Sequence, residues 1–434
     1  MMKKQFLLLA VLAMALTAQQ RLTLTVDQAV QTGLENSKAL KASQFKVVAA
    51  DAKTTEAGAA GLPSLKLNAA YTKLSDLPDA VISTPFGKFP LSATITNNYT
   101  MRATVQQPLF TGNRISGSGD IADASLEATK QDFAKDKADL IYNIKMSYWN
   151  LHRANEFQKF VDANVEQIKA HAADAENMMK QGLLTNNELL KVQVQLSDAL
   201  VRQIDAKNNV QLAMIGLNNI LGLPLNTQIE LASVLDPSAA VPAPVDALVK
   251  KAVDQRPEVL GMNARVKMSE SGLSVARSGW YPQVFLVGNY NYLRPNSRIF
   301  PTVDQFKGTW DLTLSLSYDL WTWNTTTSQT TQAEAQLSQT EQALSQLKDG
   351  VSLEVTQVAL ALSQAKERAA VAKQGVEQAE ENYRVTNERY KKGLNVNSDL
   401  LDAETALLQA RLNYTQSLID YELAGARLTR AVGE

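Results

Sequence analysis

Two acidic residues near the end of the chain, Asp399 and Asp402, have the types and spacing that could do chemistry. A separation of three residues on a helix brings both carboxylates to one face, where together they would attract cations. This chemistry is electrostatic and involves no bond making. A second interpretation stays open: Asn397 or Ser398 caps the helix, and the acids complement its dipole.

Residues for catalysis or metal binding are scarce. The two histidines, His152 and His171, stand 19 residues apart in one helical stretch, too far to share a metal, and we expect solvated or groove positions for them. Met178 and Met179 are more typical of a helix interface than of a soft-metal path. The sequence holds no P-loop, nucleophile elbow or dinucleotide fingerprint. We therefore expect no enzyme, no cofactor and no bound metal.

The first 18 residues are typical of a secretory signal peptide, with basic Lys3 and Lys4, an apolar core and cleavage after Ala18. The apolar run is too short for a membrane anchor. The chain has no Cys, which excludes disulfides, thiolate metal sites and a lipoprotein anchor. Its net charge of -1 gives no argument for nucleic acid. No later stretch reaches the ~18 apolar residues of a membrane helix, so only strands could cross a membrane.

The chain repeats itself. Residues 26–74 and 245–293 follow one plan, 219 residues apart: an apolar-periodic helix, a proline, then a strand. Residues 182–190 resemble residues 393–401 at an offset of 211, with Glu188 standing where Asp399 stands. Each half reads helix, strand, strand, long helix, helix. We predict four parts: signal peptide 1–18, first repeat 19–222, linker 223–244 and second repeat 245–434.

Helices dominate the pattern. Residues 120–181 lack Gly and Pro, and no Pro follows Pro301. Apolar residues recur every seven positions in both stretches, which indicates coiled-coil packing. At 1.5 Å per residue, each long helix would measure roughly 100 Å. The predicted helices are 26–60, 115–181, 188–221 and 325–391.

Four segments alternate apolar and polar residues with the period of two expected of strands; Trp310 to Leu320 is the clearest. At about ten residues each, they could cross a bilayer when tilted. Their predicted ranges are about 64–74, 98–108, 283–293 and 309–321. Aromatic residues at one end of the second hairpin would form a girdle at one membrane interface: Trp280, Tyr281, Trp321 and Trp323. Loops 75–97 and 294–308 would face outward. A small soluble sandwich is the alternative, which the signal peptide and the aromatics disfavour.

Four strands cannot close a membrane barrel, since the smallest have about eight. An open edge in lipid leaves backbone amides without partners. The chain must therefore oligomerise. Strand number alone does not choose between eight strands from two copies and twelve from three.

The duplication and several short motifs together resemble the TolC family of outer-membrane efflux proteins over essentially the whole mature chain. The motifs are the Leu-Pro and Tyr-Pro steps before the strands, Pro108-Leu109-Phe110-Thr111-Gly112, Tyr390-Lys391-Lys392-Gly393 and Asp399-Leu400-Leu401-Asp402-Ala403. The resemblance implies a mostly α protein with a transmembrane β-barrel: a homotrimer with a 12-stranded barrel in the outer membrane of a Gram-negative cell and a 12-helix barrel in the periplasm.

The resemblance also implies a function and partners. The protein would be the exit duct of a tripartite efflux pump or type I secretion system, with outer-membrane lipid around it, a periplasmic adaptor (membrane fusion) protein and an inner-membrane transporter of unknown class. Linker 223–244 would form a belt around the helical barrel. Cargo and transporter class stay open. The alternative is a secreted trimeric coiled-coil structural or adhesin-like envelope protein, which predicts neither matched halves nor interface aromatics.

A periplasmic gate follows from the resemblance as well. Asp399 and Asp402 match positions of the family's periplasmic aperture, where three copies would supply six carboxylates. Tyr390 matches a tyrosine that holds the tip closed by bonding across helices. Asn395 stands where the best-known member has an arginine, so the closed state would use neutral hydrogen bonds. Turns 181–187 and 391–397 would meet the adaptor.

Overall fold

The computed structural model describes residues 22–75, 80–92, 95–233, 235, 244–300 and 302–434. The predicted signal peptide 1–18 lies outside these residues, as does much of linker 223–244. The chain forms two compact units, and each repeat contributes to both. The first unit comprises residues up to Gln44, Asp132–Leu260 and Leu347–Glu434; the second comprises Phe45–Gln131 and Gly261–Gln346.

Three helices, α4, α5 and α8, follow the predicted ranges to within two residues, and the helix α9 had no predicted bounds. The two long helices, α4 and α8, contain 67 residues each. The bounds are α4 (Arg114–Lys180), α5 (Asn186–Leu221), α8 (Thr325–Lys391) and α9 (Asn397–Ala431).

The single helix predicted for residues 26–60 is wrong: the chain breaks at Ser37. There the backbone leaves the helical region, with ψ at 113°. The Ser37 hydroxyl then accepts a hydrogen bond from the Leu40 amide at 3.1 Å and so starts the next helix. The second repeat breaks likewise before Pro257, because a residue preceding proline avoids the helical conformation. The resulting helices are α2 (Val26–Asn36), α3 (Lys38–Ala59), α6 (Val245–Gln255) and α7 (Pro257–Arg277).

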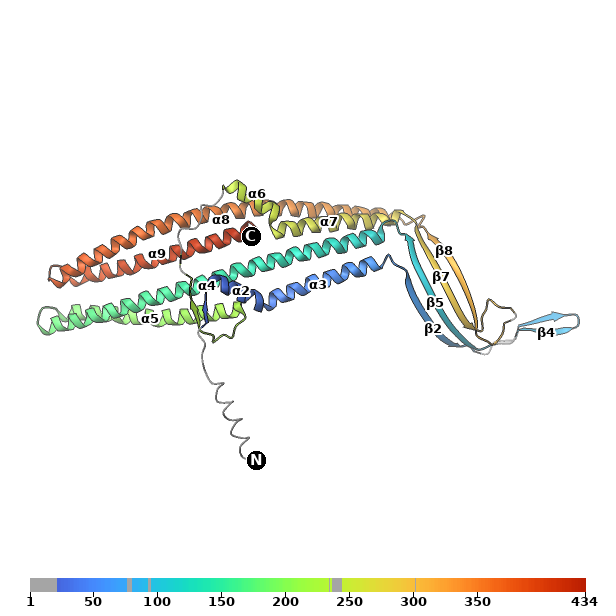
Figure 1. Cartoon of the computed structure of the whole chain (residues 1–434), viewed down its shortest axis with the longest axis horizontal. Coiled ribbons are helices and arrows are strands. Elements are labelled where there is room, and N and C mark those ends of the chain that lie inside the picture. The colour runs from blue at the N-terminus through green and yellow to red at the C-terminus, as the bar shows by residue number, and fades with distance from the viewer. Residues whose placement is uncertain (1–21, 76–79, 93–94, 234, 236–243, 301) are drawn as a thin grey trace, which may run out of the picture. The chain divides into compact units, whose positions relative to one another are not determined.

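The core of the first unit is a seam between long and short helices. Helices α4 and α5 lie side by side (Figure 1). Their contact is formed by Val161, Val165 and Ile168 of α4 and by Ala199 and Ala206 of α5. Val161 and Ile168 are seven residues apart, as the heptad pattern predicts for a packed face. Burial of these apolar side chains holds the two helices together.

A second cluster joins α4 to a small parallel strand pair in the same unit. The strands are β1 (Leu22–Leu24) and β6 (Ile229–Leu231). The buried Tyr148 hydroxyl donates to the Leu24 carbonyl at 2.9 Å and accepts from the Ser233 amide at 3.0 Å. This bridging phenol fixes the strand pair on the helix, and residues after Leu221 are thereby anchored.

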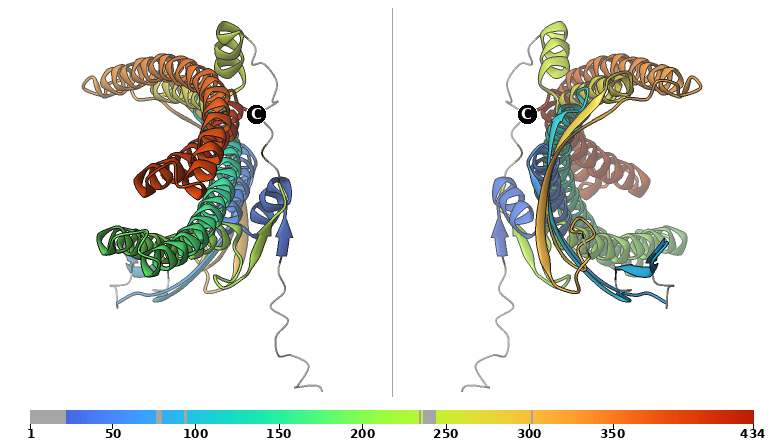
Figure 2. Two further views of the ribbon diagram at one scale, coloured as in Figure 1. Left: turned by 90° about the vertical axis from the view of Figure 1, so that its left-hand side faces the viewer. Right: turned by 90° about the vertical axis from the view of Figure 1, so that its right-hand side faces the viewer.

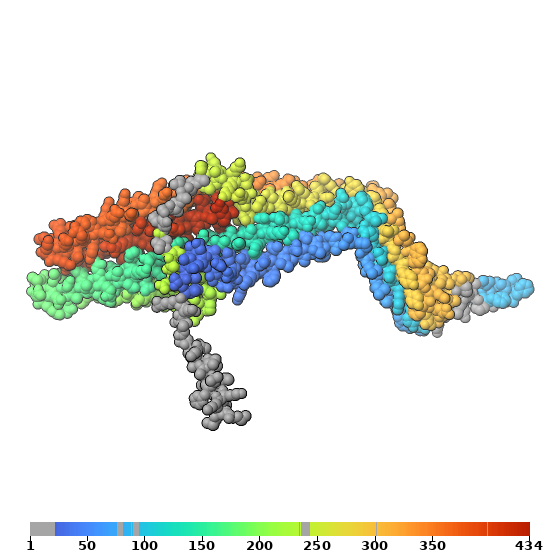
Figure 3. Space-filling view, in the orientation of Figure 1, coloured from blue at the N-terminus to red at the C-terminus, as the bar shows by residue number. Residues whose placement is uncertain are grey.

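A four-stranded antiparallel sheet forms the distal part of the second unit, in the order β2-β5-β7-β8 (Figure 1). The end-on views show it curved (Figure 2), and in the space-filling view the strands form one continuous surface (Figure 3). Strands lie where the alternation predicts them, with shifts of a few residues at the ends. Their bounds are β2 (Ser64–Lys73), β5 (Asn97–Phe110), β7 (Gln283–Arg294) and β8 (Lys307–Ser317).

The register gives this sheet one apolar and one polar face, because paired residues project to the same side. Leu67, Ala103, Tyr290 and Trp310 follow one another across the four strands. The neighbouring row of paired residues, which projects to the other face, is polar: Asn68, Arg102, Asn291 and Thr309. Large side chains of the apolar face, among them Leu67 and Trp310, are exposed to solvent in the single chain.

The loop predicted for residues 75–97 contains a hairpin that the sequence did not indicate: β3 (Ala80–Thr84) pairs with β4 (Gly87–Ser92). Within the described residues, no helix is both long and apolar enough to span a membrane.

One glycine of the second unit provides a stability test. Gly112 has φ at +59°, and a Cβ there would come within 2.7 Å of the Tyr281 Cβ and 2.9 Å of the Ser278 carbonyl oxygen. We expect Gly112→Ala to destabilise the protein by about 2 kcal/mol or more, because both the backbone conformation and the space require glycine. Thermal unfolding followed by circular dichroism measures this.

Gly119, seven residues further on in α4, is the matched control. A Cβ at Gly119 would meet nothing within 4 Å. Gly119→Ala should keep or slightly raise the melting temperature, because alanine is the better helix former. Equal melting temperatures for both variants would show that the close approach to Tyr281 is unimportant.

Candidate functional site

The two turns at the end of the first unit differ in how their following helices begin. Helix α9 starts at Asn397 with Val396 as its N-cap residue, and Val396 forms no side-chain capping bond. Capping by Asn397 or Ser398 is therefore wrong, because both lie inside the helix. In the first repeat, Thr185 caps α5 by accepting from the Glu188 amide at 3.3 Å.

The acids at these turns differ as well. Asp399 and Asp402 are both exposed, and neither forms an ion pair with the described residues. In the first repeat, Glu188 is paired with Lys191 at 3.0 Å. Asp399 still lies in the first turn of α9, where a negative charge complements the helix dipole. Among the described residues at the two turns, the second repeat therefore leaves two carboxylates without an ion pair, whereas the matching acid of the first repeat is paired.

Tyr390 is the penultimate residue of α8; its side chain is buried and reaches across to α4. Its hydroxyl donates to the Met178 sulfur at 3.8 Å, and its ring meets the His171 ring edge-on with centroids 5.3 Å apart. Burial raises the pKa of the Tyr390 phenol. The phenol therefore stays neutral and links the second repeat to the first. Asn395 lies half-exposed in the turn that follows.

Sequence reasoning missed a buried acid next to this contact. Glu404 of α9 is 5% exposed; its Oε1 accepts from Gln167 Nε2 of α4 at 2.7 Å, and its Oε2 has no partner. Burial raises the pKa of Glu404 above its ordinary range, and His171 opposes the shift. The sequence did contain a sign of this burial, because the spacing of Leu400, Glu404 and Leu407 places them on one face of the helix. Both leucines are buried.

The histidines occupy different surroundings. His171 was expected to be solvated or in a groove, and it is 5% exposed because Tyr390 covers it. His152 is half-buried, and its Nδ1 is buried without a partner. Burial lowers the pKa of His152. The two lie in separate places on α4.

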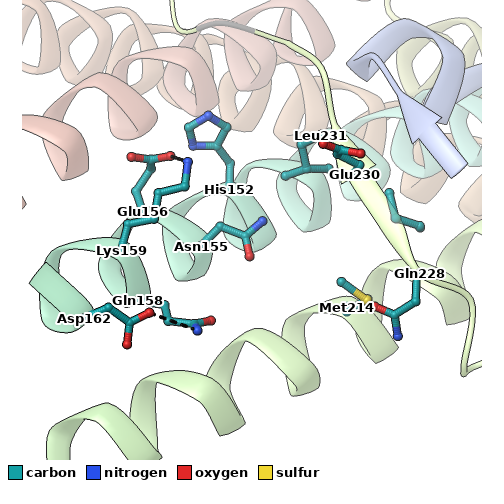
Figure 4. Close-up of a pocket in the computed structure, with 11 residues that line it drawn as sticks. His152, Asn155, Glu156, Gln158, Lys159, Asp162, Met214, Gln228, Glu230 and Leu231 are labelled. Carbon is teal, nitrogen blue, oxygen red and sulfur yellow. Dashed lines mark hydrogen bonds and ion pairs between the residues drawn. The ribbon is translucent and has the colours of Figure 1, made fainter. Parts of the chain in front are cut away.

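His152 borders a polar pocket of about 880 Å³ between α4, α5 and β6 (Figure 4). Three charged groups of its wall have partners there: Lys159 is paired with Glu156 at 2.7 Å, and Asp162 accepts from Gln158 at 3.3 Å. In the part of the chain that the structure describes, no cluster of three or more His, Cys, Asp or Glu side chains could hold a metal.

The four aromatics predicted as a girdle are all exposed in the second unit. They flank the paired ends of β7 and β8, where Gln283 faces Ser317. The Trp321 and Trp323 rings are 5.7 Å apart. Trp280 and Tyr281 immediately precede β7. The hairpin geometry thus brings both pairs to one end of the sheet.

A second aromatic group, which the sequence did not reveal, lies at the other end of the apolar face. Tyr99 contacts Tyr71 with centroids 5.0 Å apart and Phe306 at 5.7 Å, and Phe306 stacks on Tyr292 at 5.1 Å. The Arg294 guanidinium lies over the Tyr99 ring at 5.7 Å. Apolar side chains between two aromatic ends match the outward face of a membrane barrel.

Comparison with known proteins agrees with this architecture. The sequence model of the family described as "Outer membrane efflux protein" matches residues 29–223 and 248–434. The chain therefore belongs to the outer membrane efflux protein family, and the predicted relation to TolC is confirmed. Its location is the outer membrane.

One curated relative is the outer membrane protein TolC of Vibrio cholerae serotype O1, which is 23% identical over 216 residues. The match covers 50% of this chain and 49% of that protein, so the chain matches about half the length of this relative.

Solved structures share the fold over nearly the whole chain. CusC, studied for transmembrane channel formation, has a TM-score of 0.81 at 15% identity, covering 94% of this chain and 92% of CusC. The outer membrane protein VceC of Vibrio cholerae has 0.78 at 18%, with 94% and 96% covered. The open state of the MtrE outer membrane channel of Neisseria gonorrhoeae has 0.77 at 16%, with 94% and 88% covered. The family is described as an efflux protein, and CusC and MtrE are described as channels.

Glu404 gives a pH-dependent prediction. Because its pKa in the fold is raised above the ordinary 4.5, the folded protein binds this proton more tightly than the unfolded chain. Stability is then lost as pH rises from about 4.5 through the raised value. We expect Glu404→Gln, whose carbonyl still accepts from Gln167, to melt higher than the parent at about pH 8 and equally at about pH 4.

The exposed neighbour Asp402 is the control: Asp402→Asn removes an exposed carboxylate of the same helix and should leave the melting temperature close to that of the parent. If Glu404→Gln were less stable than the parent at about pH 8, the charged form of Glu404 would be a required part of the fold.

Proposed function

We propose that this protein is the outer-membrane exit channel of a tripartite efflux or type I secretion system, a homotrimer with a 12-stranded β-barrel and a 12-helix periplasmic barrel. It would be a passive duct whose periplasmic tip is gated electrostatically. A periplasmic adaptor and an inner-membrane transporter would be its partners, and the transporter would select the cargo.

The observation that carries this proposal is the two-faced sheet. Leu65, Leu312 and Leu314 are exposed on a face bounded by aromatics at both ends. Burying that face in lipid would remove its apolar area from water. The free energy gained is roughly 25 cal/mol for each Å² buried. The opposite face, with Arg102 and Asn68, would then line water. A sheet that is apolar outside and polar inside is the pattern of membrane barrels.

The sheet edges support a closed ring of copies. Strands β2 and β8 are the two ends of the strand order, and each pairs on one side alone. Lipid offers no partner for their remaining backbone groups, so pairing β2 of one copy with β8 of the next would satisfy them. Such a head-to-tail contact closes into a ring. Three copies give twelve strands, in keeping with the family.

Exposed apolar side chains of the helical unit point to the same assembly. Val194 and Val201 of α5, and Leu353 and Leu360 of α8, are exposed and spaced by seven residues. This is the spacing of a coiled-coil face, yet these side chains are not covered by the described part of the chain. Neighbouring copies would cover them and complete a barrel of twelve helices.

The proposed gate lies at the tip. Three copies would bring Asp399 and Asp402 together as six carboxylates that attract cations. The buried Tyr390, held between Met178 and His171, would latch the tip through neutral contacts. The turns at 181–187 and 391–397 would dock the adaptor.

Cell fractionation and bilayer recording test the channel function. The protein should appear in the outer-membrane fraction as a heat-modifiable species, since closed barrels resist detergent until heated. Purified protein should give discrete conductance steps. A protein found wholly in the soluble fraction, with no conductance, would instead favour a secreted coiled-coil structural protein.

The tip acids give a separate prediction. Asp399→Ala with Asp402→Ala should weaken block by divalent cations in bilayer recordings by about tenfold, because the local counter-ion concentration falls. Glu188→Ala is the matched control and should leave block unchanged, since Glu188 is already paired with Lys191. Equal block in the double variant and the parent would exclude a filter at these acids.

A further inference from the structure

The polar face of the sheet carries three cations without matching anions. Register places Lys66, Arg102 and Lys307 on this face, opposite Thr104, Asn68 and Leu293 respectively. All three side chains are exposed, and none forms an ion pair with the described residues. Their charge is therefore available to a solute that passes along the sheet.

The acids near these cations are already neutralised. Asp311, on the same face, is paired with Arg298 at 2.8 Å and also accepts from Asn289 and Asn291 at 2.8 and 3.2 Å. Asp304 of the adjoining loop is paired with Arg294 at 2.8 Å. On the described strands of the sheet, no carboxylate remains to balance the three cations.

The charge at Arg102 is held in place. Its Nε donates to the Asn291 Oδ1 at 2.7 Å, so a neutral amide orients the guanidinium without cancelling its charge. Asn291 is in turn held by Asp311. Lys66 is a diagonal neighbour of Arg102 across β2 and β5, which brings the two charges within reach of one anionic solute.

We propose that the polar face of this sheet is an anion-selective passage, in which Lys66, Arg102 and Lys307 concentrate solutes bearing carboxylate or phosphate groups. The inference rests on the proposed channel, whose trimer would line its lumen with nine such cations. Fixed charges of one sign in a confined passage raise the local concentration of the opposite ion. The sign is opposite to that of Asp399 and Asp402 at the tip.

Two lysines of one strand allow a matched test. Lys66 and Lys73 are both exposed on β2, and their positions are seven residues apart and so on opposite faces. Lys66→Gln removes a charge from the polar face and Lys73→Gln from the apolar face. Lys66 forms no hydrogen bond that its replacement would lose, so the variant should fold as the parent does.

The experiment is block of single channels by inorganic triphosphate added on the barrel side. Protein added to one side of a bilayer inserts barrel first, because the long polar helices cannot cross, and the opposite side is then the barrel side. We expect triphosphate to block the parent channel. The triphosphate concentration that gives half-maximal block should be several-fold higher for Lys66→Gln than for the parent. Lys73→Gln should behave as the parent.

The variant Lys66→Gln, Arg102→Gln, Lys307→Gln should need at least about tenfold more triphosphate. A parent channel that triphosphate does not block, or equal block of the Lys66 and Lys73 variants, would overturn the inference while leaving the channel intact. Absence of any conductance from the parent protein would instead refute the proposed function, and the inference with it.

Discussion

The structure depends on the backbone hydrogen bonds at the two outer edges of the sheet. Among the described strands, β2 and β8 each pair on one side alone. Water could satisfy the remaining amides and carbonyls, but lipid cannot. In the proposed channel the apolar face lies in lipid, so the edges would have to pair with other copies of the chain. Edge pairing would then link the membrane face, the lumen and the number of subunits.

Charge is distributed unevenly between the two repeats at the tip. Thr185 caps α5 and Lys191 neutralises Glu188, whereas α9 begins at an uncapped end with Asp399 and Asp402 unpaired. Capping and ion pairing stabilise a helix end, and their absence leaves charge for other uses. The duplicated chain thus has one turn whose following helix is capped and charge-compensated, and one whose charges are left for the proposed gate.

Much of the secondary structure could be predicted because its causes are local. The period of two in β8 and the long Gly- and Pro-free stretch of α4 depend on neighbouring residues alone. The break at Ser37 was missed because one residue left the helix without Gly or Pro to mark it. The aromatic group around Tyr99 was missed because its members come from four separate segments.

The sequence by itself determined the family, the order of helices and strands, and the alternation that divides the sheet into two faces. Periodicity and motif order are properties of the chain, so they can be read without coordinates. Only the tertiary structure decided which charges remain free. Glu404 is buried because α4 lies against α9. The charge of Asp311 is compensated because Arg298 forms an ion pair with it. Burial and pairing depend on residues distant in sequence, and no local pattern specifies them.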